Sequence, residues 1–469
     1  MNVDNVHTVR DAIGLAYLSY NEAKPLIGSG PDRQIRHPEW TRKLLNRLGN
    51  PDTHGYNIAV TGSKGKGSHS ILLAAILEKC GFKTGLFTGP HLVDFMERFR
   101  VDGQTISEPQ FMSYMKTVYQ ESARLPVPTG QYFGPVGLLA AVASLWFRDE
   151  STDVNVFELG RGALHDDVNQ IRHQGAVITP IFLEHVRELG PTLLDIAVEK
   201  SGVIAGARWV SCAPQGPQVS AQLALQSQQS NAKLRVLGEQ FDYRRESQGN
   251  NELVELTYPE GRYVIQLPES ELSTPVNPML AENAAVAFDA ARQVMLELWP
   301  EERIPGLLDL SRLVLPGRLQ VLRDSPLIAV DGTIHAQSAR YIKDWAQGLK
   351  RSGRVRQLGL VVGIPADKDG AGVLKVLSEA ADWVILTRAH NPHLNFDSEL
   401  AQTASEYFPL VRQEDYLEEA VKTAHESITA EDGLLLLGTQ SFVGDALRIF
   451  DYPTRSIWRH SPTWEGVQS

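Results

Sequence analysis

The chain has 469 residues, of which 42% are hydrophobic and 22% charged, a composition typical of globular proteins, and its length predicts more than one domain. The net charge of −11 argues against a nucleic-acid-binding protein with a basic surface, and two cysteines exclude a disulfide scaffold or a cysteine-rich metal cluster. The amino-terminal residues do not resemble a signal peptide, and no apolar run approaches the roughly 20 residues that cross a bilayer. We therefore expect a soluble, cytoplasmic protein.

The first half of the chain predicts a parallel α/β unit. A helix over residues 39–48 precedes a buried strand over 56–60, which leads through a glycine-rich turn into an apolar helix over 71–79. The further elements predicted here are strands over 85–88, 154–159, 176–179 and 208–212, and helices over 136–147 and 192–201. Such an alternation builds a mostly parallel sheet with helices on its faces.

The second half predicts a separate α/β unit. Alternation with a period of two over residues 237–268 indicates an antiparallel hairpin, and a long helix follows over 281–298. A proline-rich stretch around 300–318 marks the domain boundary, so we divide the chain into residues 1–312 and 313–469. In the smaller domain the predicted buried strands are 327–330, 358–362, 383–386 and 434–437.

The glycine-rich turn is the strongest local motif. Residues 61–68 read T-G-S-K-G-K-G-S and join a strand to a helix, where main-chain N–H groups and the helix dipole bind anions. Lys66 would reach the outer phosphates of a nucleotide, and Ser68 would contact Mg²⁺ or a phosphate. The strict P-loop pattern is absent, because Val60 stands at its first glycine and Gly67 follows the lysine. A flexible turn that carries a lysine is the alternative.

The form T-G-x-x-G-K-G-S resembles the ATP loop of the Mur ligase superfamily, in particular of its folylpolyglutamate synthase/dihydrofolate synthase branch. Residues 158–169 are similar to the motif E-x-G-L-G-G-R-L-D-x-T-N of that branch. Further similar segments, in the same order as in the family, are residues 88–92, 97–101, 183–204, 283–285, 315–319, 330–332 and 437–445. The resemblance implies a P-loop-type ATPase domain with a mostly parallel sheet and a smaller, Rossmann-like carboxy-terminal domain.

The same resemblance implies a metal centre. The matched positions are two metal ligands, Glu158 and His185, and a lysine carbamylated by CO₂, Lys200. Mg²⁺ prefers oxygen, and a carbamate would turn the amine into a carboxylate-like donor. The hydroxyl groups of Ser68 and Thr88 would serve as further ligands, with two ions expected.

Contacts to ATP and to the other substrates are implied in the same way. The implied nucleotide-binding residues are Gly62, Ser63, Lys64, Gly65, Lys66, Gly67, Ser68, Asn283, Arg318 and Asp331. His91, Asp166 and His335 would contact the acceptor and the amino acid, and Lys66, His185 and Lys200 would be catalytic. Without the resemblance, Glu199–Lys200 would be a solvated helix pair and His185 an ordinary surface or core histidine.

The function implied is that of an ATP-dependent carboxylate–amine ligase. An acceptor carboxylate would form an acyl phosphate, and an amino acid, by resemblance L-glutamate, would displace the phosphate. We expect a monomer with small-molecule substrates, without nucleic-acid or membrane partners.

Several positions depart from the family pattern. Gly89 replaces a serine that supplies a hydroxyl to the first Mg²⁺, and Leu164 replaces an arginine. The histidine after Asp331 is displaced by one place to His335, and a further His-Asn-Pro occurs at residues 390–392. Two alternatives follow: the same chemistry on a non-folate acceptor of a specialised pathway, or an inactive ATP-binding regulatory paralogue.

Overall fold

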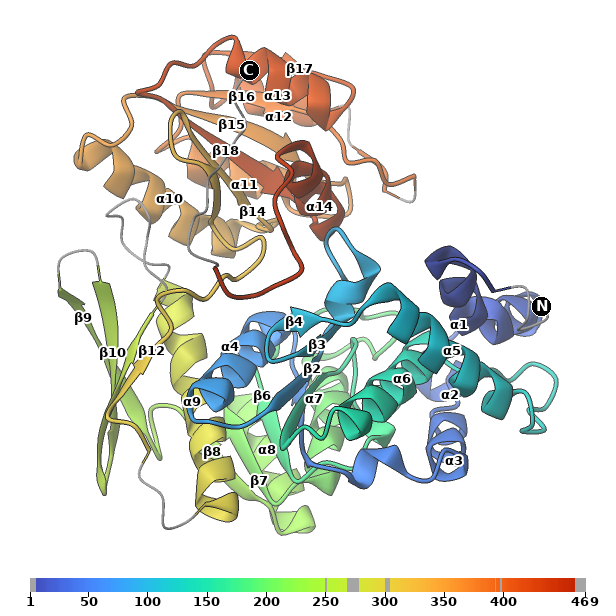
Figure 1. The fold of residues 1–469 in the computed structure, drawn as a ribbon. Helices are drawn as coiled ribbons and strands as arrows, with labels where there is room; N and C mark the ends of the chain where they lie inside the picture. The colour runs from blue at the N-terminus through green and yellow to red at the C-terminus, as the bar shows by residue number, and fades with distance from the viewer. Residues whose placement is uncertain are drawn as a thin grey trace.

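The computed structural model describes residues 6–248, 251–267, 278–299, 304–392, 394–396 and 399–459. The chain folds into a larger amino-terminal body and a smaller carboxy-terminal body, each built on a sheet flanked by helices (Figure 1). This arrangement confirms the predicted α/β fold class, whereas the boundary at residues 312/313 stays a prediction. Within the described ranges, no helix combines the length and apolar character that crossing a bilayer requires.

An eight-stranded sheet organises the larger body, in the order β4-β3-β2-β5-β1-β6-β7-β8. Its strands are β1 (Tyr56–Thr61), β2 (Thr84–Phe87), β3 (Phe99–Val101), β4 (Gln104–Thr105), β5 (Val154–Glu158), β6 (Gly175–Ile178), β7 (Trp209–Cys212) and β8 (Lys233–Val236). All pairs are parallel except those that add β3 and β4, which form an antiparallel edge. The four parallel strands predicted after β1 are confirmed to within about one residue, and the short edge strands were not predicted.

Helices cover both faces of this sheet. The helices are α1 (Val9–Ala23), α2 (Asp32–Ile35), α3 (Glu39–Arg47), α4 (Lys66–Lys79), α5 (Glu108–Ser122), α6 (Pro135–Asp149), α7 (Leu193–Ser201), α8 (Pro217–Ser230) and α9 (Pro278–Leu298). Alternate residues of β1 point to opposite faces: Ile58 and Val60 pack with α4 and α9, whereas Ala59 belongs to the core that includes α1, α5 and α6. Helix α4 begins five residues earlier than predicted, directly after the left-handed Gly65.

A small sheet packs beside α9. It consists of β9 (Asp242–Gln248), β10 (Asn251–Tyr258), β11 (Gly261–Gln266) and β12 (Leu307–Asp309). The first three strands are antiparallel, which confirms the predicted hairpin and extends it by one strand, and β12 pairs in parallel with β11.

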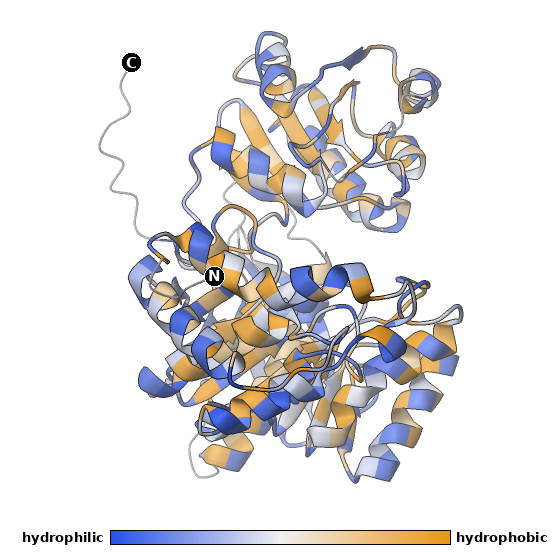
Figure 2. Ribbon diagram, turned by 90° about the vertical axis from the view of Figure 1, so that its right-hand side faces the viewer, coloured by the Kyte–Doolittle hydropathy of each residue, from blue (hydrophilic) through white to orange (hydrophobic). Residues whose placement is uncertain are grey.

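The smaller body has a six-stranded sheet in the order β13-β14-β18-β15-β16-β17. The strands are β13 (Gln320–Arg323), β14 (Leu327–Asp331), β15 (Leu358–Gly363), β16 (Trp383–Leu386), β17 (Val411–Gln413) and β18 (Gly433–Gly438). The helices are α10 (Ala336–Arg351), α11 (Gly370–Leu377), α12 (Leu400–Ser405), α13 (Leu417–His425) and α14 (Gln440–Ile449). Hydrophobic and hydrophilic residues alternate around these helices (Figure 2), so each presents an apolar face to the sheet.

The segment after the smaller body returns to the larger one. The Arg100 guanidinium on β3, 3% exposed, donates hydrogen bonds to the carbonyl oxygens of Gly103 (3.1 Å), Thr454 (2.7 Å) and Arg455 (3.0 Å). Trp458 Nε1 donates to Glu78 Oε2 on α4 at 2.8 Å. The two bodies are therefore joined twice, by the segment before β13 and by this returning tail.

We predict that Arg100→Met lowers the free energy of unfolding by about 2–4 kcal/mol, because three buried carbonyl groups lose a charged donor. Urea unfolding followed by circular dichroism measures the change. Arg244→Met is the matched control, since this arginine is 75% exposed and its variant should stay within about 0.5 kcal/mol of the parent. Equal midpoints for the Arg100 variant and the parent would contradict the prediction.

Candidate functional site

Two glycines shape the loop between β1 and α4. Gly62 has a φ of +140°, and a Cβ there would collide with Thr179 Oγ1, so no other residue fits. Gly65 has a φ of +89° and stands directly before α4. Ser63 Oγ accepts a hydrogen bond from Phe182 N at 3.1 Å, which ties the loop to the segment after β6. The start of α4 thus has the geometry of a turn at which an anion can bind, and its contact with phosphate stays a prediction.

The loop carries two lysines that point in different directions. Lys66 Nζ donates to the Gly62 carbonyl oxygen at 3.0 Å and stays over the loop. Lys64 Nζ instead reaches the smaller body and donates to Ser338 Oγ on α10 at 3.0 Å. Burial lowers the pKa of Lys64, and the nearby Arg318 acts in the same direction. An anion bound between Lys64 and Arg318 would offset the repulsion between these two cations.

A cleft lies between the loop and the smaller body, and its space together with the adjoining open solvent amounts to about 670 Å³. Its walls come from the loop, the start of α9, the segment before β13, and the β14–α10 connection. The lining residues are Lys64, Gly65, Ser68, Met279, Leu280, Asn283, Leu315, Arg318, Asp331, Gly332, Thr333, Ser338 and Ile342. Five of the predicted nucleotide-binding side chains, Lys64, Ser68, Asn283, Arg318 and Asp331, therefore come together. Apolar walls and cations at one end suit a nucleotide base and its phosphates.

Glu158 ends β5 at the carboxyl edge of the sheet, where ligands bind in open α/β folds. It is 8% exposed, and its Oε2 accepts a hydrogen bond from Gly89 N at 3.1 Å. Burial raises the pKa of this carboxyl to about 7, although Lys66 pulls it the other way. A Cβ on Gly67 would lie 3.5 Å from Oε2, so the carboxylate abuts the first turn of α4. A buried carboxylate in this state would be stabilised by a cation.

Lys200, on the last turn of α7, is fully buried. Its Nζ contacts three acceptors: the carbonyl oxygens of Gly62 (2.8 Å) and Arg161 (2.6 Å), and Glu184 Oε1 (3.0 Å). Burial lowers the pKa of the amine to about 8, and Lys66 acts in the same direction. The solvated helix pair that the sequence suggests without the resemblance is excluded, because Glu199 and Lys200 are 7% and 0% exposed.

His185 lies in the connection from β6 to α7 with a φ of +47°, and its side chain is half exposed. Nε2 is 3.9 Å from Glu184 Oε2, and Nδ1 is 4.0 Å from Glu188 Oε2. Burial lowers the pKa of the imidazole, although both glutamates raise it. Glu184 was not singled out from the sequence, yet it stands next to the histidine and contacts Lys200.

The site offers some, but not all, of the ligands that a hard divalent cation needs. Through the described part of the chain, no three His, Cys, Asp or Glu side chains converge tightly enough to hold a metal ion. The buried Glu158 carboxylate, Glu184 and His185 are donors, and phosphate oxygens or a carbamate on Lys200 would have to complete the coordination. Ser68 lines the cleft, whereas for Thr88 the structure shows a main-chain bond, N to Arg98 O at 3.0 Å.

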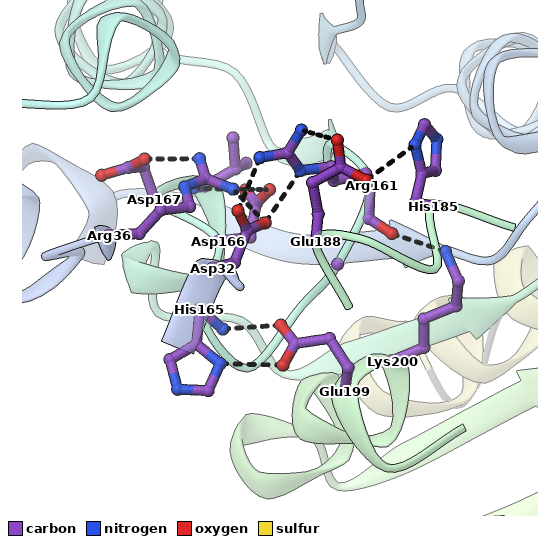
Figure 3. A network of polar contacts seen from close by, with 12 residues as sticks. Asp32, Arg36, Arg161, His165, Asp166, Asp167, His185, Glu188, Glu199 and Lys200 are labelled. Carbon is purple, nitrogen blue, oxygen red and sulfur yellow. Dashed lines mark hydrogen bonds and ion pairs between the residues drawn. The ribbon is translucent and has the colours of Figure 1, made fainter. Parts of the chain in front are cut away.

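Asp166 belongs to a network of buried charges (Figure 3). Its Oδ2 lies 3.4 Å from Arg36 Nη1, and Asp167 Oδ2 lies 2.7 Å from Arg36 Nη2. Burial raises the pKa of Asp166, although Arg36 opposes the shift. Below this network, both carboxylate oxygens of Glu199 accept from His165, at Nδ1 (2.8 Å) and at the main-chain N (2.9 Å). The role of Asp166 as a substrate contact stays a prediction.

Three histidines named from the sequence lie outside the cleft lining. His91 Nδ1 accepts a hydrogen bond from Arg98 Nε at 3.2 Å. His335 immediately precedes α10, and burial lowers its pKa. His390 stacks on Tyr416 with ring centroids 4.8 Å apart and pairs with Glu418 at 2.9 Å. Contacts of the first two with substrates stay predictions.

Comparisons with known proteins agree with this geometry. The family model "Mur ligase, glutamate ligase domain" matches residues 317–440. The dihydrofolate synthase/folylpolyglutamate synthase of Escherichia coli (strain K12) is 28% identical over 407 residues, 86% of this chain and 89% of that one.

Solved structures match over most of their length. Mycobacterium tuberculosis folylpolyglutamate synthase, complexed with ADP and AMPPCP, has a TM-score of 0.74 and 26% identity, over 93% of this chain and 99% of that one. A bifunctional folylpolyglutamate synthase/dihydrofolate synthase from Yersinia pestis, complexed with AMPPNP and a Mn ion, has a TM-score of 0.70 and 25% identity, over 88% and 93%. Over most of its length the chain is therefore similar to members of the folylpolyglutamate synthase/dihydrofolate synthase branch of the Mur ligase superfamily, and these matches place it among the ADP-forming ligases.

Proposed function

We propose that the chain adds L-glutamate to the carboxyl group of a folate-like acceptor at the expense of ATP, as a monomer. The observation that carries the proposal is the meeting of Lys66 and Lys200 at the Gly62 carbonyl oxygen, beside the cleft and the buried Glu158. The matched relatives are named for folate substrates, and two matched structures are complexes with adenine nucleotides.

ATP would occupy the cleft with its phosphates on the loop. The apolar side chains of Leu280, Leu315 and Ile342 would face the base, and Lys64 and Arg318 would face phosphate oxygens. Lys66 would exchange the Gly62 carbonyl oxygen for the γ-phosphate and neutralise charge that develops during transfer. Attack by the acceptor carboxylate breaks the bond between the γ-phosphorus and the bridging oxygen and yields ADP and an acyl phosphate. The glutamate amine then forms the amide and releases phosphate and a proton.

Glu158, His185 and Lys200 would hold Mg²⁺, and Glu184 would stand next to them. The bound cation would supply Lewis-acid stabilisation of phosphoryl oxygens. The residues themselves place a carboxylate, an imidazole and an amine at one edge of the sheet, and the loop shields the amine from water. A cation free in water would not be held in a fixed position before the substrates bind, as these side chains would hold it.

Carbamylation of Lys200 is part of the proposal. The ammonium group first loses one proton; the neutral amine then attacks CO₂, a C–N bond forms as a C=O π bond breaks, and a second proton leaves to solvent, so the group changes from a cation to an anion. A pKa of about 8 makes the neutral amine available near that pH. Glu184, 3.0 Å from Nζ, would then face a negative group, and a divalent cation would offset that repulsion.

The comparisons offer no support for a non-folate acceptor or for an inactive regulatory paralogue. The buried state of Lys200 and Glu158 also disfavours the inactive alternative, because keeping two buried ionisable groups without a function would only destabilise the fold.

We expect phosphate release from Mg·ATP and L-glutamate to require dihydropteroate or tetrahydrofolate. Lys200→Ala should lower kcat on the order of 100-fold or more, because the side chain that would carry the carbamate ligand is lost. The exposed Lys375 provides the matched control, and Lys375→Ala should keep full turnover. Turnover with unrelated carboxylic acids alone would overturn the folate assignment, and unchanged turnover of the Lys200 variant would overturn its role.

Glu158→Gln should abolish turnover and yet stabilise the protein at pH 8 when nucleotide and divalent cations are absent. The pKa of about 7 lies above the usual 4.5, so the folded state binds more protons than the unfolded state between these values, and stability falls as pH rises through that window. The difference in the free energy of unfolding between variant and parent should grow to about 2–3 kcal/mol as the pH rises from 4.5 to 8.

Urea unfolding of both proteins across this pH range measures the difference. Glu406→Gln is the control, because Glu406 is exposed and its variant should follow the parent at every pH. A Glu158 variant that is less stable than the parent at pH 8 would show that the carboxylate is already compensated by its surroundings.

A further inference from the structure

Arg161, three residues after β5, joins three segments of the site. Its carbonyl oxygen accepts the hydrogen bond from Lys200 Nζ at 2.6 Å. Its guanidinium binds Asp32 through two hydrogen bonds, from Nε to Oδ2 at 2.8 Å and from Nη2 to Oδ1 at 2.5 Å. Nη1 lies 3.6 Å from Glu188 Oε1. One residue therefore contacts Lys200 with its main chain and two acids with its side chain (Figure 3).

The acids that Arg161 binds hold the segment that carries His185. Asp32 N donates to the Glu188 carbonyl oxygen at 2.8 Å, so α2 is attached to the β6–α7 connection by main chain as well. Glu188 N in turn donates to the His185 carbonyl oxygen at 3.0 Å, and Glu188 Oε2 lies 4.0 Å from His185 Nδ1. The path from Arg161 to the imidazole consists of these contacts.

The Asp32 carboxylate at the centre of this arrangement is well shielded, whereas the Arg161 side chain is 34% exposed. Asp32 is 1% exposed, and its second basic neighbour, Arg36, lies 3.6 Å away and also binds Asp167 at 2.7 Å. A bidentate arginine–carboxylate pair has a defined geometry as well as strength, and loss of the arginine leaves a buried carboxylate short of a partner. A lysine could replace the charge but not the two parallel hydrogen bonds.

The motif that residues 158–169 resemble has leucine where Arg161 stands and arginine where Leu164 stands. Leu164 is 47% exposed here, and its main chain packs against α7, with N donating to Glu199 O at 2.9 Å. An arginine is thus present in this stretch, but at the position whose side chain faces Asp32 and Glu188.

We propose that Arg161 is a positioning residue: it fixes Lys200 through its carbonyl and the His185 segment through Asp32 and Glu188, without touching ATP. The catalytic consequence rests on the proposed function, since it requires Lys200 and His185 to act in turnover. Arg161→Leu keeps the carbonyl group that Lys200 contacts, but releases that main chain and the His185 segment from the Asp32 anchor, so kcat falls while ATP still binds.

The test compares Arg161→Leu, Arg161→Lys, Asp32→Asn and the double variant Asp32→Asn/Arg161→Leu. Arg161→Leu should lower kcat on the order of 100-fold, with the KM for ATP unchanged within about threefold, and Arg161→Lys should recover part of the loss. The double variant should be no slower than Arg161→Leu alone, because the two residues act through one contact.

Arg42→Leu is the matched control. Arg42 forms an equally close bidentate pair with the fully buried Asp52, at 2.6 and 3.0 Å, away from Lys200 and His185. Its variant should lose comparable stability and keep kcat within about twofold, as distant sites do. All assays are run well below the unfolding midpoint of each variant.

Hydrogen exchange measured by mass spectrometry gives a readout that does not depend on the proposed function. Peptides covering residues 182–190 should exchange on the order of tenfold faster in Arg161→Leu than in the parent or in Arg42→Leu. Unchanged exchange there, or an equal loss of kcat in Arg42→Leu, overturns the proposal. A parent enzyme without ligase turnover refutes the proposed function, and the exchange rates still decide whether Arg161 holds the segment.

Discussion

The Gly62 carbonyl oxygen accepts hydrogen bonds from both Lys66 and Lys200, and the rest of the site depends on this shared contact. One lysine comes from the first turn of α4 and the other from the last turn of α7, so the bond joins the loop after β1 to the helix after β6. The oxygen can accept hydrogen bonds from both ammonium groups because a carbonyl oxygen has two lone pairs. The contact brings positive charge to the point where the sheet ends and anions bind.

Loss of hydration on burial explains the shifted pKa values around that point. Glu158 is buried with a raised pKa, and Lys200 is buried with a lowered one, so both groups are shifted toward neutrality. Neither has enough opposite charge nearby to offset the loss of water. A nucleotide with a divalent cation would bring both signs of charge, and the same groups would then be stabilised in their ionised forms.

The smaller body completes the site without contributing to the sheet that carries it. Lys64 crosses to Ser338, and the returning tail is held by Arg100, so the cleft has walls from both bodies. A cleft between two separately folded bodies can change its width without repacking either core. Lys200 and Glu158, which do not line the cleft, lie within the larger body, on α7 and at the end of β5.

The sequence by itself determined the parallel strands and the glycine loop, because continuous apolar runs and glycine at strained positions leave direct traces in the sequence pattern. The roles of residues 158, 185 and 200 came only from the family resemblance and stay predictions. The antiparallel edge strands β3 and β4 were missed, because two or three residues carry no periodic signal. The tertiary structure alone decided that Lys200 is buried on three acceptors, that Glu184 contacts it, and that Arg161 binds Asp32, 129 residues away. Such pairs follow from how the chain packs, and no local pattern records which distant charge will face a given side chain.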